Sequence, residues 1–189
     1  MDKLDRDKFL KVYWKQYQLM ERDLIQTDDY VSIVKENYDT FSNQYMKLLL
    51  VICSEMDSIA EVLCRMREDK VPWGIVNKLN ALTEEYPNLK NYRVSTKYPY
   101  DIKNIVPMAK FSGDSASDWW QAYNDIKHRR METNDAGRSN YTKANLKSVL
   151  YAMAALYILN RTLYDSLEDN GKTSDEILIS GLFENGLII

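Results

Sequence analysis

Apolar side chains recur along most of the chain at alternating steps of three and four residues. This spacing places them on one face of a helix, because an α-helix turns by about 100° per residue. Between residues 3 and 26 the repeat consists of Leu10, Tyr13, Tyr17, Met20 and Leu24. Between about residues 42 and 68 it consists of Tyr45, Leu48, Leu49, Ile52, Met56, Ile59, Leu63 and Met66. We therefore predict two amphipathic helices in the first part of the chain.

Three further helices are predicted. Pro72 suits the first position of a helix over residues 72–86, because that position uses no backbone N–H. A helix over residues 115–131 has a core stripe of Trp119, Ala122, Tyr123 and Ile126. The last helix, over residues 142–168, has Asn140 or Thr142 as its cap. The chain is thus expected to form an all-α helical bundle in a single domain, residues 1–189.

The composition agrees with a helical globular protein. Of the 189 residues, 45% are hydrophobic and 28% are charged, and only six are Gly and four are Pro, which argues against a turn-rich β-sandwich. This length is sufficient for one domain with a sizeable core. The net charge of −3 provides no overall basic surface, so any nucleic-acid site has to be local.

The N-terminal segment and the cysteines favour a cytoplasmic protein. Residues 1–8 are rich in charge and resemble no signal peptide, and the longest apolar run, residues 149–159, is too short for a membrane span. Cys53 and Cys64 lie on one predicted helix, roughly 16 Å apart at about 1.5 Å per residue. We therefore predict free thiols and no cysteine-based metal site. No Gly-rich phosphate loop is present, and we predict no cofactor.

Residues 87–113 lose the helical repeat. Tyr92, Tyr98 and Tyr100 lie among Lys90, Arg93, Lys97 and Lys103, with Pro99 and Pro107 interrupting any long element. Aromatic side chains interleaved with basic ones can stack on bases and neutralise phosphates. A tyrosine-rich loop packed over the bundle accounts for the same pattern, so both interpretations stay open.

The C-terminal segment is apolar although no helix is predicted for it. It contains Ile177, Leu178, Ile179, Leu182 and Phe183 and ends in Leu187, Ile188 and Ile189. Leaving this much apolar surface in water is unfavourable. We therefore expect the segment to dock on the bundle or on a partner.

The candidate chemistry is concentrated in the predicted helix over residues 115–131. This helix carries His128, the only histidine of the chain, and two of the four tryptophans. Asn124 and His128 are neighbours at a four-residue spacing, opposite the core stripe, and Trp120 and Lys127 border the same face. A solvated helix surface with a tryptophan packed against a neighbour is the simpler interpretation of this face.

The same helix carries a recognisable motif. Trp120, Tyr123, Asn124, Lys127 and His128 resemble the W-x-x-Y-N-x-x-K-H signature helix of HEPN-like bacterial proteins. The resemblance implies an RNA-directed protein in a defence or toxin–antitoxin setting. The catalytic candidates are His128, Asn124 and Lys127. The candidates for substrate binding are Trp120, Tyr123, Arg129, Arg130 and Glu55.

HEPN ribonucleases carry an R-x(4–6)-H motif, whose Arg and His meet across a homodimer and cleave RNA without a metal. The positions for that Arg are Gln121, Ala122 and Tyr123, so the basic residue is absent. In such an enzyme the imidazole acts as general base or acid and a cation stabilises the phosphorane. Lys127 shares a face with His128 and is the better substitute, although an ammonium lacks the planar fork of arginine.

Glu55 is the acidic residue of interest, because it borders the apolar stripe of the helix over residues 42–68. A carboxylate at the core edge is unfavourable unless it is paired. We expect Glu55 to be largely buried and paired with a donor, and His128 and Lys127 are the first candidates. A salt bridge to another Lys or Arg, without a functional part, is the alternative.

The missing arginine also favours a different function. Trp, Tyr, Met and Arg are enriched at protein interfaces. The face around Trp120 can therefore belong to a non-catalytic module that binds a protein partner or a second copy of the chain. The two functions to be weighed are thus RNA-directed activity and helical protein–protein interaction.

Overall fold

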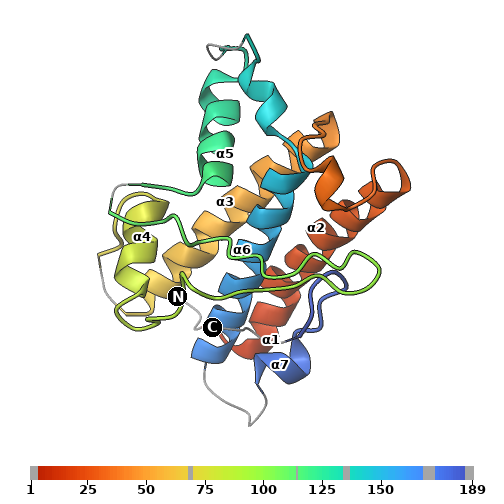
Figure 1. Cartoon of the computed structure of the whole chain (residues 1–189). Helices are drawn as coiled ribbons and strands as arrows, with labels where there is room; N and C mark the ends of the chain where they lie inside the picture. Colours follow the sequence, from red (N-terminus) through yellow and green to blue (C-terminus); the bar gives the residue numbers. More distant parts are fainter. Residues whose placement is uncertain (1–3, 68–69, 114, 134–136, 168–172, 186–189) are drawn as a thin grey trace.

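The computed structural model describes residues 4–67, 70–113, 115–133, 137–167 and 173–185, and within these ranges the chain is an all-α bundle (Figure 1). The longest helices of the described chain are α3 (Asn43–Arg65) and α6 (Leu146–Ser166). Shorter helices are α2 (Lys15–Ile25), α4 (Ile75–Leu82), α5 (Asp118–Arg129) and α7 (Ser174–Ile177). The described residues form isolated β-bridges but no strand. The predicted fold class is confirmed.

The first predicted helix changes type within its length. α1 (Arg6–Phe9) continues through a π-helical turn, Leu10–Trp14, into α2. Phe9 and Trp14 are buried, whereas Leu10 and Tyr13 of the predicted stripe are only partly buried. A π turn spaces its hydrogen bonds one residue further apart than an α turn. The inward face therefore shifts at a point that a regular repeat does not reveal.

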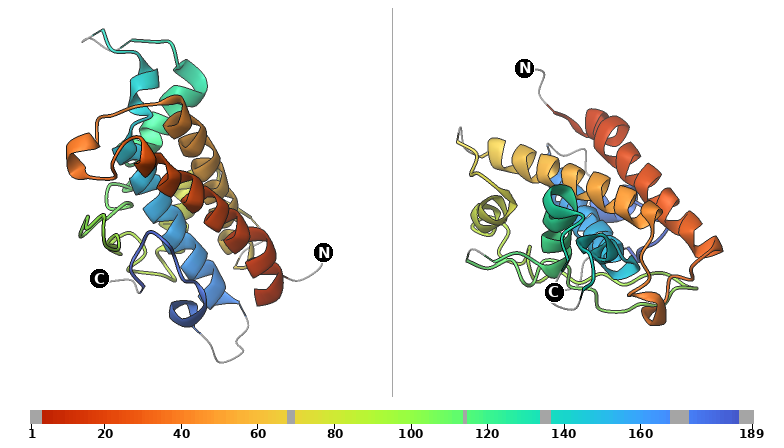
Figure 2. Two further views of the ribbon diagram at one scale, coloured as in Figure 1. Left: turned by 90° about the vertical axis from the view of Figure 1, so that its right-hand side faces the viewer. Right: turned by 90° about the horizontal axis from the view of Figure 1, so that it is seen from above.

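α6 is enclosed on nearly its whole circumference. Every side chain from residue 152 to residue 164 is buried, including Asn160, Arg161 and Thr162. Such burial requires neighbours on several sides, and α2, α3 and α5 all contact α6. α3 lies along α6, and α2 crosses the pair (Figure 2). The core is thus built around the last long helix.

Side-chain caps start the two central helices. The Ser42 hydroxyl accepts a hydrogen bond from the Tyr45 N–H at 3.0 Å, and the Asn145 side chain accepts one from the Ser148 N–H at 2.9 Å. These bonds satisfy backbone donors that have no partner within the helix. The caps predicted for the last helix belong instead to a 3₁₀ turn, Asn140–Lys143. The helix therefore begins later than predicted, at Leu146.

α4 is shorter than the helix predicted over residues 72–86. Gly74 precedes it with a φ of 78°, which glycine adopts without the steric cost that a Cβ brings. The chain turns sharply at Gly74, so Pro72 and Trp73 lie outside the helix. The prediction that Pro72 starts the helix is wrong. Trp73 is left 93% exposed.

α3 confirms the longest predicted stripe. The positions of that stripe are buried from Tyr45 to Leu63, whereas Met66, at the C-cap, is 46% exposed. Cys53 and Cys64 are both buried free thiols, as predicted. Burial raises the pKa of the Cys53 thiol well above its ordinary value.

Residues 87–113 contain no helix and cross the bundle as a loop (Figure 1). Tyr92 and Tyr100 pack against the core, while Tyr98 is 92% exposed. Three lysines of the loop bind acceptors within the protein: Lys90 the Asn80 side chain (2.6 Å), Lys97 the Ser180 carbonyl (2.7 Å) and Lys103 the Glu184 carboxylate (2.8 Å). These contacts favour a loop packed on the bundle over an RNA-binding loop.

The C-terminal segment docks on the bundle through a buried carboxylate. Glu21 of α2 is 5% exposed. Its Oε2 accepts a hydrogen bond from the Gly181 N–H at 2.8 Å, and its Oε1 accepts one from the Leu182 N–H at 3.1 Å. The hydroxyl groups of Tyr17 and Ser180 also donate to Oε1. Docking on the bundle is thereby confirmed, and residues 187–189 lie outside the described residues.

Candidate functional site

A cleft of about 710 Å³ opens between α3, α4 and α5. The α5 wall consists of Trp120, Tyr123, Asn124, Lys127 and His128. These are the residues of the signature motif, and the structure places them on one surface. The opposite wall contains Asp57, Glu61 and Arg65 of α3, Lys78 of α4 and Trp73.

The α5 wall is anchored by aromatic packing and ends in accessible polar groups. Trp120 and Tyr123 are each 7% exposed, and their ring centroids lie 5.0 Å apart. The Lys127 ammonium donates to the Tyr123 hydroxyl at 3.3 Å and lies 5.4 Å from the centroid of the same ring. His128 is exposed, and no described residue hydrogen-bonds to its side chain. The imidazole is therefore accessible from the cleft.

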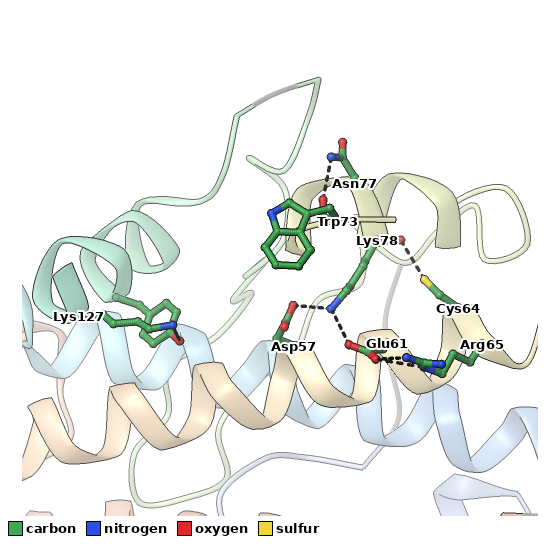
Figure 3. Close-up of polar contacts among 9 residues, drawn as sticks. Asp57, Glu61, Cys64, Arg65, Trp73, Asn77, Lys78 and Lys127 are labelled. Carbon is green, nitrogen blue, oxygen red and sulfur yellow. Dashed lines mark hydrogen bonds and ion pairs between the residues drawn. The ribbon is translucent and has the colours of Figure 1, made fainter. Parts of the chain in front are cut away.

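The opposite wall contains a compact ion-pair network (Figure 3). The Lys78 side chain is only 6% exposed, and its ammonium lies 3.0 Å from Asp57 Oδ1 and 3.3 Å from Glu61 Oε2. Arg65 donates to Glu61 Oε1 at 2.7 Å. These hydrogen bonds, from Arg65 and then from Lys78, lower the pKa of Glu61. Two carboxylates and two cations thus neutralise each other on this wall.

The excess of positive charge in the cleft therefore lies on the α5 side. Lys127 forms no ion pair with any described residue, and His128 is next to it in sequence. Trp73 extends from the rim above Asp57 (Figure 3), with 93% of its surface exposed. The cleft combines an unpacked aromatic ring, an unpaired cation and an accessible imidazole.

Arg129 and Arg130, predicted to bind substrate, do not line this cleft. Arg129 donates to Asp125 Oδ1 at 2.5 Å, and Lys143 donates to Asp125 Oδ2 at 2.6 Å. Asp125 lines a second cleft, of about 570 Å³, on the other side of α5. Arg130 is exposed at the end of the helix. Each residue along α5 is rotated by about 100°, which carries Arg129 away from the face of His128.

Glu55 lies apart from the cleft as well. It is half-buried, and burial of the phenol, followed by the charge of Glu55, raises the pKa of Tyr13. Burial likewise raises the pKa of Glu55. Within the described chain it forms no hydrogen bond with His128 or Lys127, so the expected pairing is wrong. Asp57 is two residues further along, about 200° around the helix, and it occupies the side that faces α5.

Trp73 and Lys78 line the cleft but were not predicted as site residues. Their positions depend on the sharp turn at Gly74 and on how α4 packs against α3, neither of which has a local signal. Asp57 and Glu61 did have a local signal, because together with Arg65 they recur every four residues on the polar side of their helix. These three residues belong to the α3 wall of the cleft.

Acidification is expected to destabilise the fold through Asp125 and Glu61. Desolvation raises the pKa of Asp125, but hydrogen bonds and charges from Lys143 and Arg129 outweigh this effect, so that the pKa lies below its ordinary value of 3.8. The pKa of Glu61 is likewise lowered from its ordinary value of 4.5. A carboxyl group whose pKa is lower in the folded than in the unfolded state stabilises the fold at pH values above its unfolded pKa. This stabilisation is lost as the pH falls through its folded pKa. Urea unfolding at pH 7 and pH 3 should show the loss. Between these two pH values the Asp125→Asn variant should lose less free energy of unfolding than the parent protein. An equal loss would contradict the role of Asp125.

The protein is thus an all-α protein with a polarised cleft beside one short helix. No protein-family model matches the chain, and neither a curated protein nor a solved structure does. In the described part of the chain, no group of His, Cys, Asp and Glu residues is placed to hold a metal ion. A membrane span needs roughly 20 apolar residues in a row, and none of the described helices provides one.

Proposed function

We propose that the protein is RNA-directed and that it binds single-stranded RNA in the cleft between α3, α4 and α5. The observation that carries this proposal is Trp73, which is 93% exposed on the rim of a cleft that also holds Lys127 and His128. A tryptophan in a globular protein normally buries most of its surface. Unstacked RNA bases are commonly bound on such aromatic faces.

The charges of the cleft support the same proposal. The ion pairs of Lys78 with Asp57 and Glu61 neutralise the α3–α4 wall, so a phosphate is attracted to Lys127 on the α5 wall. Asn124 lies one turn before His128 and offers an amide donor and acceptor. A nucleotide stacked on Trp73 can therefore place its phosphate along α5.

RNA cleavage would add one step to this binding. The His128 imidazole would accept the proton of the 2′-hydroxyl as its oxygen attacks phosphorus, and a proton would return to the leaving 5′-oxygen. Lys127 would stabilise the charge on the phosphoryl oxygens. The motif positions for an arginine hold no basic residue, and Arg129 is engaged by Asp125. These facts favour binding over rapid cleavage.

A protein interface is the second candidate function. It is favoured by the exposure of Met131 (82%), just beyond α5, together with that of Trp73. Exposed Trp and Met are enriched in the cores of protein interfaces. A homodimer through the α5 face remains a prediction, which analytical ultracentrifugation of the purified protein tests.

RNA binding is tested with a labelled single-stranded RNA of mixed sequence and fluorescence anisotropy. Trp73→Ala should weaken binding by roughly 5- to 150-fold, because stacking on an aromatic residue contributes about 1–3 kcal/mol per base. Tyr98→Ala is the matched control, since Tyr98 is 92% exposed but lies outside the cleft. The proposal fails if the parent binds no RNA, or if both variants lose affinity equally.

The same protein should be assayed for RNA cleavage with and without a chelator. If cleavage occurs, His128→Ala should abolish it, because no other imidazole exists in the chain. The melting temperature should change little, since His128 is exposed. Cleavage that survives the substitution would exclude His128 as a catalytic residue, while binding without cleavage would assign a binding role.

A further inference from the structure

We infer that the cleft selects guanine and that Asp57 recognises the Watson–Crick edge of the base. This inference rests on the proposed function, since it assigns the kind of nucleotide to the same cleft. It depends on three features: an acceptor that is still available, a ring on which the base can stack, and a cation for the phosphate.

Asp57 provides the acceptor. Its side chain is 42% exposed and lines the cleft. Its Oδ1 accepts from the Lys78 ammonium at 3.0 Å, and no described residue donates to its Oδ2. A carboxylate has about four lone-pair positions. Asp57 therefore lines the cleft with most of its acceptor capacity unused by the described residues.

Lys78 holds this carboxylate in place. Its ammonium is nearly buried and is also bound to Glu61, so its position is constrained from two sides. Glu61 is less available than Asp57, because Arg65 donates twice to its Oε1 and Lys78 occupies its Oε2. A functional group fixed by such supporting contacts loses little freedom when it binds a ligand.

The chemistry of the bases then decides which one fits. Guanine presents two adjacent donors, N1–H and N2–H, which match the two oxygens of a carboxylate. The amino groups of adenine and cytosine each have a ring-nitrogen acceptor beside them, and the N3–H of uracil lies between two carbonyl oxygens. Those acceptors would face the Asp57 carboxylate unfavourably. Hydrogen bonds to an ionised acceptor are also stronger than neutral ones.

Trp73 and Lys127 complete the site. The Trp73 indole lies above Asp57 (Figure 3), so a base stacked on the indole can direct its edge towards the carboxylate. Lys127 on the facing wall is available to the phosphate. Guanine with a phosphate occurs both in RNA and in free guanine nucleotides, and either source presents the same groups.

The test uses four labelled RNA oligonucleotides that are identical except for a single central G, A, C or U. We expect the G-containing oligonucleotide to bind on the order of tenfold more tightly than the others. Asp57→Asn should abolish this preference, because a carboxamide replaces one acceptor by a donor, so that the four oligonucleotides bind the variant with equal affinity. Asparagine can still accept from Lys78, and circular dichroism should confirm an unchanged fold. Glu36→Gln, at an exposed acid outside the cleft, is the charge-matched control.

The outcomes separate the two proposals. Equal binding of all four oligonucleotides overturns guanine selection and leaves RNA binding intact. A preference for G that persists in Asp57→Asn overturns the role of Asp57. Competition by GMP or GTP at the concentration of the RNA, but not by AMP or ATP, supports guanine recognition and identifies free nucleotides as a source. Failure of every RNA to bind overturns the proposed function.

Discussion

Replacing Glu21 by alanine is expected to lower the free energy of unfolding by about 3–5 kcal/mol. The Glu21 carboxylate is 5% exposed and accepts hydrogen bonds from two hydroxyl groups and from the backbone N–H groups of Gly181 and Leu182. Its removal takes away the acceptor that these donors share. The Leu182 N–H and the Tyr17 hydroxyl keep only the Ser180 hydroxyl oxygen as a partner, and a buried donor left without an acceptor costs about 1–3 kcal/mol. The loss is smaller than a simple sum, because the C-terminal segment can detach and reach water.

Urea unfolding followed by circular dichroism measures this change. Detachment of the segment should also increase the rate at which protease cleaves the chain near Gly181. Glu36→Ala is the control, because Glu36 is exposed and a surface substitution usually changes stability by about 0.5 kcal/mol or less. A loss below about 1 kcal/mol for Glu21→Ala would mean that the carboxylate does not anchor the segment.

Ile52→Ala is expected to destabilise the protein by about 2–5 kcal/mol. Ile52 is fully buried in α3, the helix that packs most extensively on α6. Truncation removes apolar contacts and leaves a cavity that the surrounding helices can fill only in part. The effect should appear as a lower urea midpoint with an unchanged slope.

The neighbouring residue provides a matched control for this prediction. Val51 lies on the same turn of α3 but is 40% exposed, so Val51→Ala should cost well under half as much. Similar losses for the two variants would mean that α3 is rotated relative to the arrangement described above. The comparison therefore tests the orientation of the helix that forms one wall of the cleft.

The apolar stripe of α3 was predictable almost residue by residue, because a regular helix repeats its faces at a constant angle. The stripe near Tyr13 was less predictable, since the π turn shifts the face by an amount that depends on packing. The start of α4 was misjudged for a related reason. Pro72 is compatible with a first helical turn, but the positive φ of Gly74 reorients the chain after it.

The candidate site shows the same division. Trp120, Tyr123, Asn124, Lys127 and His128 could be grouped from the sequence because all five lie within three turns of one helix. Glu55 was assigned to them incorrectly, and Asp57 was passed over. The choice between these two acids requires knowing which side of α3 faces α5, and that orientation depends on side chains throughout the core.

The sequence by itself determined the helical class, the inward stripe of each long helix and the polar face of α5, because these properties depend on residues a few positions apart. Only the tertiary structure decided that Asp57, Lys78 and Trp73 face α5 across a cleft. It also decided that Arg129 is held by Asp125 and that Glu21 receives the C-terminal segment. Such contacts join residues distant in sequence or on different faces of a helix. Their geometry follows from the packing of the whole core around α6, which no local pattern encodes.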